Sequence, residues 1–391
     1  MKDRKLLMIP GPIEFMPEVM RAMGMPTTSH VAPNFLEVFD QALKRLREVF
    51  LCPDGQPFII AGSGTLAMDM SAVNLIEPGD RALVVSTGYF GSRFAAILEG
   101  YGADVVQVDA PSIGDAPALE AVEEVLKEAD YKLMTITHVD TSTAVRADVK
   151  GLAALGRAHG ALVLVDGVCS VAGEELRQAE WGVDLTLTAS QKAIGVPPGL
   201  ALVMAGPRAM EAARRRKSPV INYYADWARW LPIMESAEAR DPRYFGTPPV
   251  NHIWALNVSL GQILDEGMDA RFARHRWLSE AFKAAVEALG MAQVPASADR
   301  AANTMTAPYF PPGVDQGLLT EIKRAGVIVA GGLHPDIKAE YFRVGHMGVV
   351  TSSDILATVG AVEYGLARVG YRFEPGVGLA AAQTVLLRGP A

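Results

Sequence analysis

Residues 161–193 read ALVLVDGVCSVAGEELRQAEWGVDLTLTASQKA, and they are the most informative segment for the class of fold. It begins with an unbroken apolar run at 161–165, which ends at Asp166, and a second β-rich run follows at 185–188. A strand with one solvated face alternates apolar and polar residues, whereas a strand covered on both faces is apolar throughout. The run at 161–165 therefore predicts a central strand of a parallel sheet with helices on both faces.

The same pattern extends outward from this stretch. Short apolar runs alternate with segments whose apolar residues recur at helical spacing, which is typical of an α/β fold. Helices are predicted over 65–75, 91–101, 118–128 and 149–159. Further strands are predicted at 57–60, 81–86, 105–108, 132–137 and 200–204. We therefore expect one seven-stranded, mostly parallel sheet.

The pattern changes near Gly267. Residues 253–290 read as mostly helical, and short strands at 303–308, 327–330 and 341–344 precede a helix over 353–369. That order is typical of an α+β unit with a small sheet. We place a large domain, with the N-terminal segment, at 1–266 and a smaller α+β C-terminal domain at 267–391. We interpret its last residues, 376–391, as a loosely held tail.

Composition excludes several classes of protein. Half of the 391 residues are hydrophobic, and 36 Lys+Arg against 44 Asp+Glu give a net charge of −8. This balance argues against a disordered chain and against a general nucleic-acid binder. No stretch approaches the roughly 18 apolar residues of a membrane helix. The two cysteines, Cys52 and Cys169, are too few for a disulfide framework, and neither end carries a targeting signal, so we expect a cytoplasmic protein.

The segment GSGTLA at 62–67 lies between a predicted strand and a predicted helix. Its glycine spacing is compatible with a dinucleotide site, with a lone phosphate bound at a helix N-terminus, or with a plain tight turn. A nicotinamide site needs an acidic residue at the end of the next strand, but that strand ends in Val85, Ser86 and Thr87. A phosphate cradle is therefore the favoured interpretation.

Two ionisable residues follow buried strands. Asp166 lies where open α/β sheets bind ligands, although such a residue also serves as a helix N-cap. Lys192 follows the strand at 185–188 among small and apolar residues. Desolvation there would lower the pKa of the amine and favour Schiff-base chemistry, although a lysine that extends its amine to solvent is an equal alternative.

Arg343 lies within an apolar strand and needs a partner. A substrate carboxylate would match its guanidinium, and an internal salt bridge is the alternative. The seven histidines show no metal-ligand spacing, so no metal site is expected. A phosphate loop, a strand-end aspartate, a buried lysine and a distal arginine together suit one chemistry, that of an enzyme using pyridoxal 5′-phosphate.

Further segments carry a resemblance to a known family over nearly the whole chain. They are PGP (10–12), SGT (63–65), THVDTST (137–143), LVD (164–166), SQKA (190–193), PPG (197–199), YFGTPPV (244–250) and FRVGH (342–346). In these segments the chain resembles the class V aminotransferases of fold type I. Within that family it resembles the group of alanine–glyoxylate and serine–pyruvate or serine–glyoxylate aminotransferases. The spacing from LVD to SQKA, followed by PPG, is the most specific part.

The resemblance implies a role for each matching residue. Lys192 would form the Schiff base with pyridoxal 5′-phosphate and then move the proton, and Asp166 would bind the ring nitrogen. Phe90 would stack on the ring where the family usually has tryptophan, and Thr141 would reach the ring hydroxyl. The resemblance assigns the phosphate to Ser63, Gly64, Thr65 and Gln191, although the family often has histidine at the position of Thr65.

The remaining matches concern the substrate and a second subunit. Gly11 and Arg343 would contact the substrate. Tyr244 and Thr247 match residues that reach the phosphate of the neighbouring subunit, so the resemblance implies a homodimer with shared sites. His30 would lie near the mouth of the site. Ala144 stands where many relatives have glycine.

These features predict an aminotransferase that moves the amino group of alanine or serine to glyoxylate or pyruvate, in a ping-pong reaction through pyridoxamine phosphate. Another class V enzyme stays open as an alternative, such as a pyridoxamine–pyruvate aminotransferase, a ureidoglycine–glyoxylate aminotransferase or a lyase. A non-catalytic relative is disfavoured because Lys192 is present, and a nicotinamide enzyme is disfavoured because the ribose-binding acid is absent.

Overall fold

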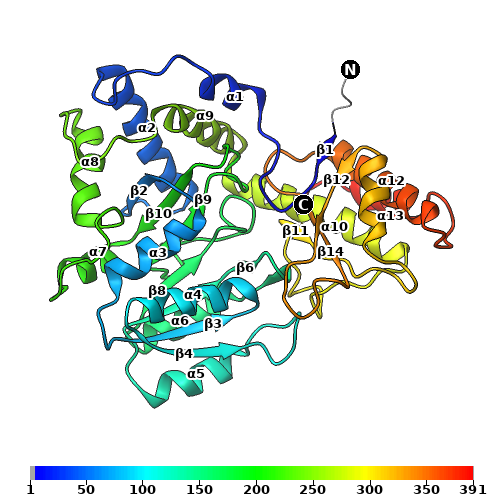
Figure 1. Ribbon diagram of the computed structural model, residues 1–391, viewed down its shortest axis with the longest axis horizontal. Coiled ribbons are helices and arrows are strands. Elements are labelled where there is room, and N and C mark those ends of the chain that lie inside the picture. The colour runs from blue at the N-terminus through cyan, green and yellow to red at the C-terminus, as the bar shows by residue number, and fades with distance from the viewer. Residues whose placement is uncertain (1–4, 391) are drawn as a thin grey trace.

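A computed structural model describes residues 5–390 and contains the predicted seven-stranded sheet (Figure 1). In sheet order its strands are β2 (Gln56–Ala61), β10 (Leu200–Ala205), β9 (Leu185–Ala189), β8 (Leu162–Asp166), β5 (Leu133–Thr137), β3 (Arg81–Ser86) and β4 (Asp104–Asp109). Only β10 runs against its two neighbours in this sheet. The predicted α/β fold with a mostly parallel sheet is therefore confirmed.

Helices cover this sheet and explain its apolar strands. Val163, Leu164 and Val165 of β8 are fully buried, as expected for a strand covered on both faces. The helix α4 packs on β3, β4 and β5, and α6 packs on β5 and β8. The helices of this part are α1 (Pro17–Met23), α2 (Pro33–Val49), α3 (Gly64–Leu75), α4 (Tyr89–Gly100), α5 (Leu119–Glu128), α6 (Val149–Ala158), α7 (Pro207–Arg214), α8 (Trp227–Ala239) and α9 (Val250–Glu266).

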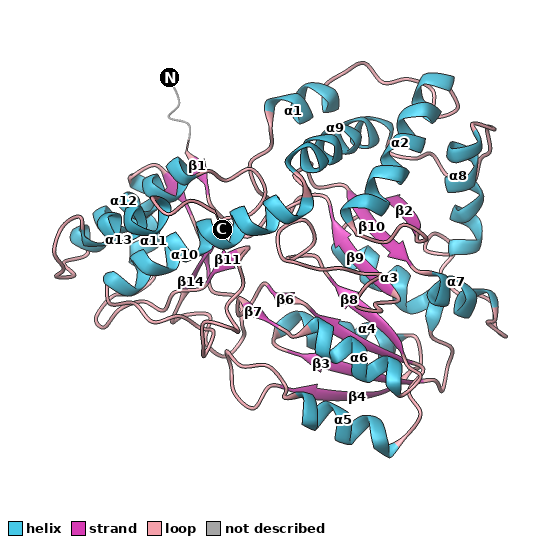
Figure 2. Cartoon of the chain, turned by 180° about the vertical axis from the view of Figure 1, so that it is seen from behind, coloured by secondary structure: helices cyan, strands magenta, loops and turns pink. Residues whose placement is uncertain are grey.

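The C-terminal part has its own hydrophobic cluster, which includes Phe282, Phe342 and Leu366. Figure 2 shows its helices gathered beside the sheet. Met8 also belongs to this cluster, because β1 (Leu6–Leu7) pairs with β12 (Val327–Ile328). The other elements are β6 (Val139–Asp140), β7 (Val145–Arg146), α10 (Met268–Ala288), β11 (Met305–Thr306), α11 (Gly317–Arg324), β13 (Ala330–Gly331), β14 (Phe342–Gly345), α12 (Ser352–Arg368) and α13 (Val377–Leu386). The division of the chain at 266/267 stays a prediction.

The interpretation of 376–391 as a loose tail is wrong for the helix α13 within it, and residue 391 lies outside the described residues. The helix α13 packs against α10 and α12, and Ala382 is fully buried. The Glu363 carboxylate of α12 accepts hydrogen bonds from the amides of Gly376, Gly378 and Leu379. A side chain distant in the sequence therefore satisfies the free amides at the start of this helix, which the local sequence does not reveal.

Candidate active site

A cavity of about 220 Å³ lies at the carboxyl edge of the sheet, where β2, β8 and β9 end. It brings together most of the residues that the sequence singles out. These are Gly11, Ser63, Gly64, Thr65, Phe90, Thr141, Asp166, Gln191 and Lys192. Met68, Arg93, Val139 and Val168 complete the lining.

Lys192 and Asp166 are the two ionisable groups at the centre of this cavity. Lys192 is 8% exposed, and its Nζ donates to the carbonyl oxygen of Pro10. Burial lowers the pKa of Lys192, the charge of Arg343 lowers it further, and Cys169 and Asp166 act in the opposite direction. The lysine is thus a buried amine of reduced basicity, as Schiff-base chemistry requires.

Asp166 ends β8 and is 3% exposed. Burial raises its pKa to about 6, although the Val168 amide donates to Oδ1 at 2.9 Å and favours the charged form. The charges of Lys192 and Arg93 also favour ionisation. A cationic partner in the cavity would stabilise this carboxylate further, which suits a protonated pyridine nitrogen.

Gly11 closes the cavity beside Lys192. Its φ is +102°, in the region that favours glycine, and a Cβ there would lie 2.5 Å from Cδ and 2.8 Å from Cε of Lys192. A side chain at position 11 would therefore displace the lysine. The backbone of Gly11 thus lies against the Lys192 side chain, and its contact with a substrate stays a prediction.

The start of α3 offers the groups that bind phosphate. Ser63 is its N-cap residue, but the serine side chain makes no capping hydrogen bond. A Cβ on Gly64 would lie 2.8 Å from Val168 Cγ2, so the tight approach of α3 to the turn after β8 needs glycine. Gln191 also lines this cavity, and the NH2 group of its side-chain amide is the atom that could donate to a phosphate, because the amide oxygen only accepts. Free donors at a helix N-terminus, beside a buried amine and a buried carboxylate, fit pyridoxal 5′-phosphate.

Phe90 is held in place by residues to which the sequence analysis assigned no role. Its amide donates to Asp140 Oδ2 at 2.8 Å, and Asp140 is fully buried. The Arg93 guanidinium lies 4.8 Å from the centroid of the Phe90 ring, and its Nη1 is 3.3 Å from Thr65 Oγ1. Helical spacing could have placed Arg93 beside Phe90, because residues three apart share a helix face.

Three predicted site residues do not line this cavity. Arg343 lies on β14, where Nε donates to Gly331 O at 2.8 Å and Nη1 donates to Thr141 O at 3.1 Å. Burial lowers the pKa of Arg343. Its partners are therefore carbonyl groups and not an internal carboxylate. Tyr244 is 69% exposed, its ring lies 5.5 Å from that of His30, and Thr247 is also exposed.

The chain is similar to a known family and to several known proteins. The family model described as Aminotransferase class-V matches residues 16–351. The chain is 42% identical to alanine–glyoxylate aminotransferase 1 of Saccharomyces cerevisiae over 89% of this chain and 93% of that protein. It is 31% identical to the serine–glyoxylate aminotransferase of Arabidopsis thaliana, over 98% of this chain and 95% of that protein.

A solved structure agrees with these sequence relatives. The alanine–glyoxylate aminotransferase of Nostoc sp. superimposes with a TM-score of 0.87 at 31% identity, covering 93% of this chain and 95% of that one. None of the helices between residues 5 and 390 combines the length and the apolar character that crossing a bilayer requires.

Proposed function

This chain belongs to the class-V aminotransferase family, and from that premise we propose that it binds pyridoxal 5′-phosphate around Lys192 and transfers the amino group of alanine or serine to glyoxylate. The chain is an enzyme of the aminotransferase type. The single observation that carries the cofactor assignment is the meeting of Lys192, Asp166 and the N-terminus of α3 in one cavity.

When bound, the cofactor supplies an aldehyde for covalent attachment and a ring that accepts electrons from the substrate Cα. Lys192 is the residue that attaches it, and its weakly basic amine then takes and returns the proton at Cα. Asp166 pairs with the ring nitrogen and keeps that nitrogen protonated. Ser63, Gly64 and Gln191 hold the phosphate, while Thr65 and Thr141 offer hydroxyl groups and Phe90 covers one ring face.

Arg343 is the proposed anchor for the substrate carboxylate. Its guanidinium already donates to Thr141 O, a residue of the cavity wall, so the strand β14 places a cation beside the site. The charge of Arg343 contributes to the lowered pKa of Lys192, which supports their proximity. A small monocarboxylate such as alanine needs one such cation, and Gly11 leaves room for its approach.

A homodimer is part of the same proposal. Ile221, Tyr223 and Tyr244 are 77%, 65% and 69% exposed, which is unusual for large apolar and aromatic side chains. Tyr244 and Thr247 lie outside their own cavity, as expected of residues that reach the phosphate in a neighbouring subunit. A second copy of the chain would cover these side chains and complete each site.

The absorption spectrum of the purified protein tests the reaction. With the cofactor added, we expect a visible band that is absent from Lys192→Ala, that alanine or serine removes and that glyoxylate restores. A wild-type spectrum identical to that of Lys192→Ala would contradict the assignment. Recovery only with pyruvate and free pyridoxamine would identify a pyridoxamine–pyruvate aminotransferase instead.

A further inference from the structure

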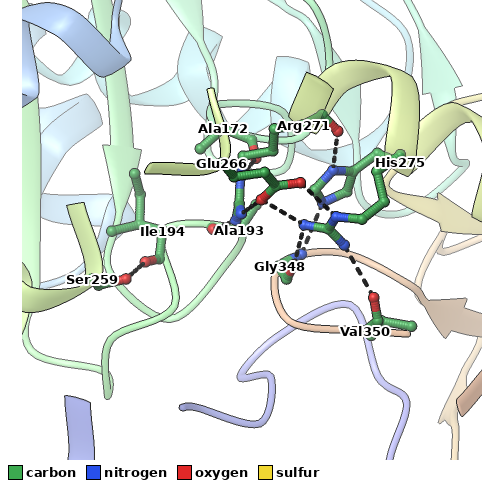
Figure 3. Close-up of polar contacts among 10 residues, drawn as sticks. Ala172, Ala193, Ile194, Ser259, Glu266, Arg271, His275, Gly348 and Val350 are labelled. Carbon is green, nitrogen blue, oxygen red and sulfur yellow. Dashed lines mark hydrogen bonds and ion pairs between the residues drawn. The ribbon is translucent and has the colours of Figure 1, made fainter. Parts of the chain in front are cut away.

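Four charged or ionisable side chains meet where α9 ends and α10 begins, and they form what we call the junction cluster: Glu266, Arg271, Arg274 and His275. Figure 3 labels Glu266, Arg271 and His275 of this cluster. Glu266 Oε2 accepts a hydrogen bond from Arg271 Nη1 at 2.7 Å, and its Oε1 accepts one from Arg274 Nε at 2.6 Å. None of the four lines the cavity of Lys192. Arg274 Nη2 also donates to Glu266 Oε2 at 3.1 Å, and both arginines donate to backbone carbonyls as well.

Arg271 reaches the backbone behind the two central ionisable residues. Its Nη2 donates to Ala193 O at 2.8 Å, and Ala193 directly follows Lys192. Its Nε donates to Ala172 O at 2.7 Å, in the turns that follow Asp166 and β8. Arg271 is 6% exposed, so these bonds are made out of contact with bulk water and are correspondingly strong. One guanidinium thus ties the Lys192 segment to the Asp166 segment.

Arg274 and His275 extend the same connection to the strand of Arg343. Arg274 donates to Gly348 O at 2.9 Å and to Val350 O at 3.0 Å, and these residues follow β14. The Gly348 amide donates to His275 Nε2 at 2.9 Å, while His275 Nδ1 donates to Arg271 O. Burial holds the pKa of His275 well below its usual value, so the ring is neutral and keeps both bonds.

We propose that Arg271 is a positioning residue for Lys192, which sets the lysine segment against the segment of Asp166 through the carbonyls of Ala193 and Ala172. The proposal rests on the assignment of Lys192 as the cofactor-binding lysine. Without Arg271 both carbonyls lose their donor, and Glu266 keeps only Arg274 as a partner. A displacement of the lysine by roughly 1 Å can cost about 100-fold in rate, because covalent attachment depends on near-attack geometry.

The test compares Arg271→Ala and Arg271→Lys with Arg276→Ala, a matched control at an exposed position of the same helix. In the cofactor-free protein, acylation of Lys192 is followed against pH by mass spectrometry of its peptide. In the holoenzyme, the dissociation constant of pyridoxal 5′-phosphate, kcat and KM are measured. We expect Arg271→Ala to shift the labelling profile of Lys192, weaken cofactor binding by about tenfold to 100-fold and lower kcat more than KM, whereas Arg276→Ala changes none of these.

Chemical rescue distinguishes a role of Arg271 in positioning Lys192 from a general contribution of Arg271 to the stability of the fold. Arg271 lines a cavity of about 490 Å³ together with Gln262, Glu266 and Gly348, so a small guanidinium ion can reach the space that the side chain leaves. We expect methylguanidinium to restore kcat and cofactor affinity to Arg271→Ala, and sodium chloride at the same ionic strength to have no effect. Lys192→Ala should not respond to either salt.

The possible outcomes distinguish a failure of the proposed role of Arg271 from a failure of the proposed function. Wild-type labelling, affinity and kcat in a folded Arg271→Ala protein would overturn the role of Arg271. If that variant does not fold, Arg271→Lys and Ser259→Ala take its place, because Ser259 Oγ donates to Ile194 O in the same segment. Wild-type values in both would overturn the proposal. If the wild type binds no cofactor, the proposed function fails, while the labelling of Lys192 still reports whether Arg271 positions it.

Discussion

Asp166 shows at the scale of one residue how a site built for a ligand destabilises the protein without it. Burial raises the pKa of this carboxyl from 3.8 to about 6. The folded protein therefore binds more protons than the unfolded chain between these two values, so the stability of the cofactor-free protein falls as pH rises through that interval. Above it the carboxylate is charged and desolvated, which opposes folding.

Asp166→Asn should therefore stabilise the cofactor-free protein at pH 7 by about 1–3 kcal/mol. An asparagine Oδ1 can still accept the hydrogen bond from the Val168 amide, so the local turn is kept. The same change should weaken pyridoxal 5′-phosphate binding, because the ring nitrogen loses its counter-charge. Urea unfolding at pH 4 and 7 measures the stability, and the two proteins should converge at pH 4. A variant less stable than wild type at pH 7 would contradict this account.

Ala144 is a second residue whose local environment predicts a measurable change. Its φ is +60°, in the left-handed region that favours glycine, and its amide donates to Asp140 O at 2.8 Å. A left-handed conformation costs a non-glycine residue about 1–2 kcal/mol. The backbone three residues after Thr141 is therefore strained.

We expect Ala144→Gly to raise the free energy of unfolding by roughly 1 kcal/mol, after subtracting the greater entropy of glycine in the unfolded chain. Ala154→Gly is the matched control, because Ala154 is exposed within α6 and should lower that free energy by about 1 kcal/mol. Thermal unfolding of the wild type, Ala144→Gly and Ala154→Gly shows whether each change raises or lowers the free energy of unfolding. A loss of stability in Ala144→Gly would show that the strain is not relieved.

At the scale of elements, the helix α3 differs from an ordinary capped helix. The Ser63 hydroxyl makes no capping hydrogen bond to the first amides of α3. At the start of α6, by contrast, Asp148 Oδ1 accepts a hydrogen bond from the Gly151 amide at 2.9 Å. The free donors of α3 can therefore take an anion. This difference turns one of two similar strand-to-helix connections into a binding site and leaves the other as a structural cap.

Inorganic phosphate should compete with pyridoxal 5′-phosphate for the cofactor-free protein. Ser63→Ala should weaken both ligands by about tenfold, since a hydrogen bond to a charged group is lost. Asp148→Ala should cost about 1 kcal/mol of stability and leave both affinities unchanged. Titration calorimetry measures the two ligands separately. Equal phosphate affinity in wild type and Ser63→Ala would place the anion elsewhere.

At the scale of the whole molecule, the proposed homodimer makes each site depend on two chains. Lys192→Ala and Tyr244→Ala homodimers should each have low activity. A mixed dimer of the two variants contains one site that carries both changes and one that carries neither. If the chains exchange at random, an equimolar mixture should recover about one quarter of wild-type activity, because half of the dimers are mixed and half of their sites are intact.

The recovery is followed after refolding the two variants together, with size-exclusion chromatography and light scattering to report the mass. The control is a mixture of Lys192→Ala with Asp166→Ala, a second variant of the same cavity. In a mixed dimer of these two variants, each site still carries one of the two substitutions. Absence of recovery with Tyr244→Ala, in a protein that is dimeric, would show that Tyr244 does not serve the neighbouring site.

Patterns along the chain are enough to predict the sheet, its strands and the residues at its carboxyl edge. Apolar runs such as 161–165 reflect burial on two faces. Asp166 is the last residue of β8 and Lys192 lies three residues after the end of β9, so local order along the chain already places both at one edge. The resemblance then supplied the cofactor, because a set of short segments in fixed order is more specific than any single motif.

The side chains that support Asp166, Lys192 and Phe90 from distant parts of the chain are found only in the folded protein. Arg271 bonds the carbonyl of Ala193, 78 positions earlier in the chain, and that of Ala172, 99 positions earlier. Glu363 and Asp140 likewise accept hydrogen bonds from backbone amides that lie elsewhere in the sequence, at the start of α13 and at Phe90 respectively. Such contacts join a side chain to whatever backbone the fold brings near, and no periodicity along the sequence encodes them. Burial then strengthens these contacts, because no water competes for the same donors and acceptors.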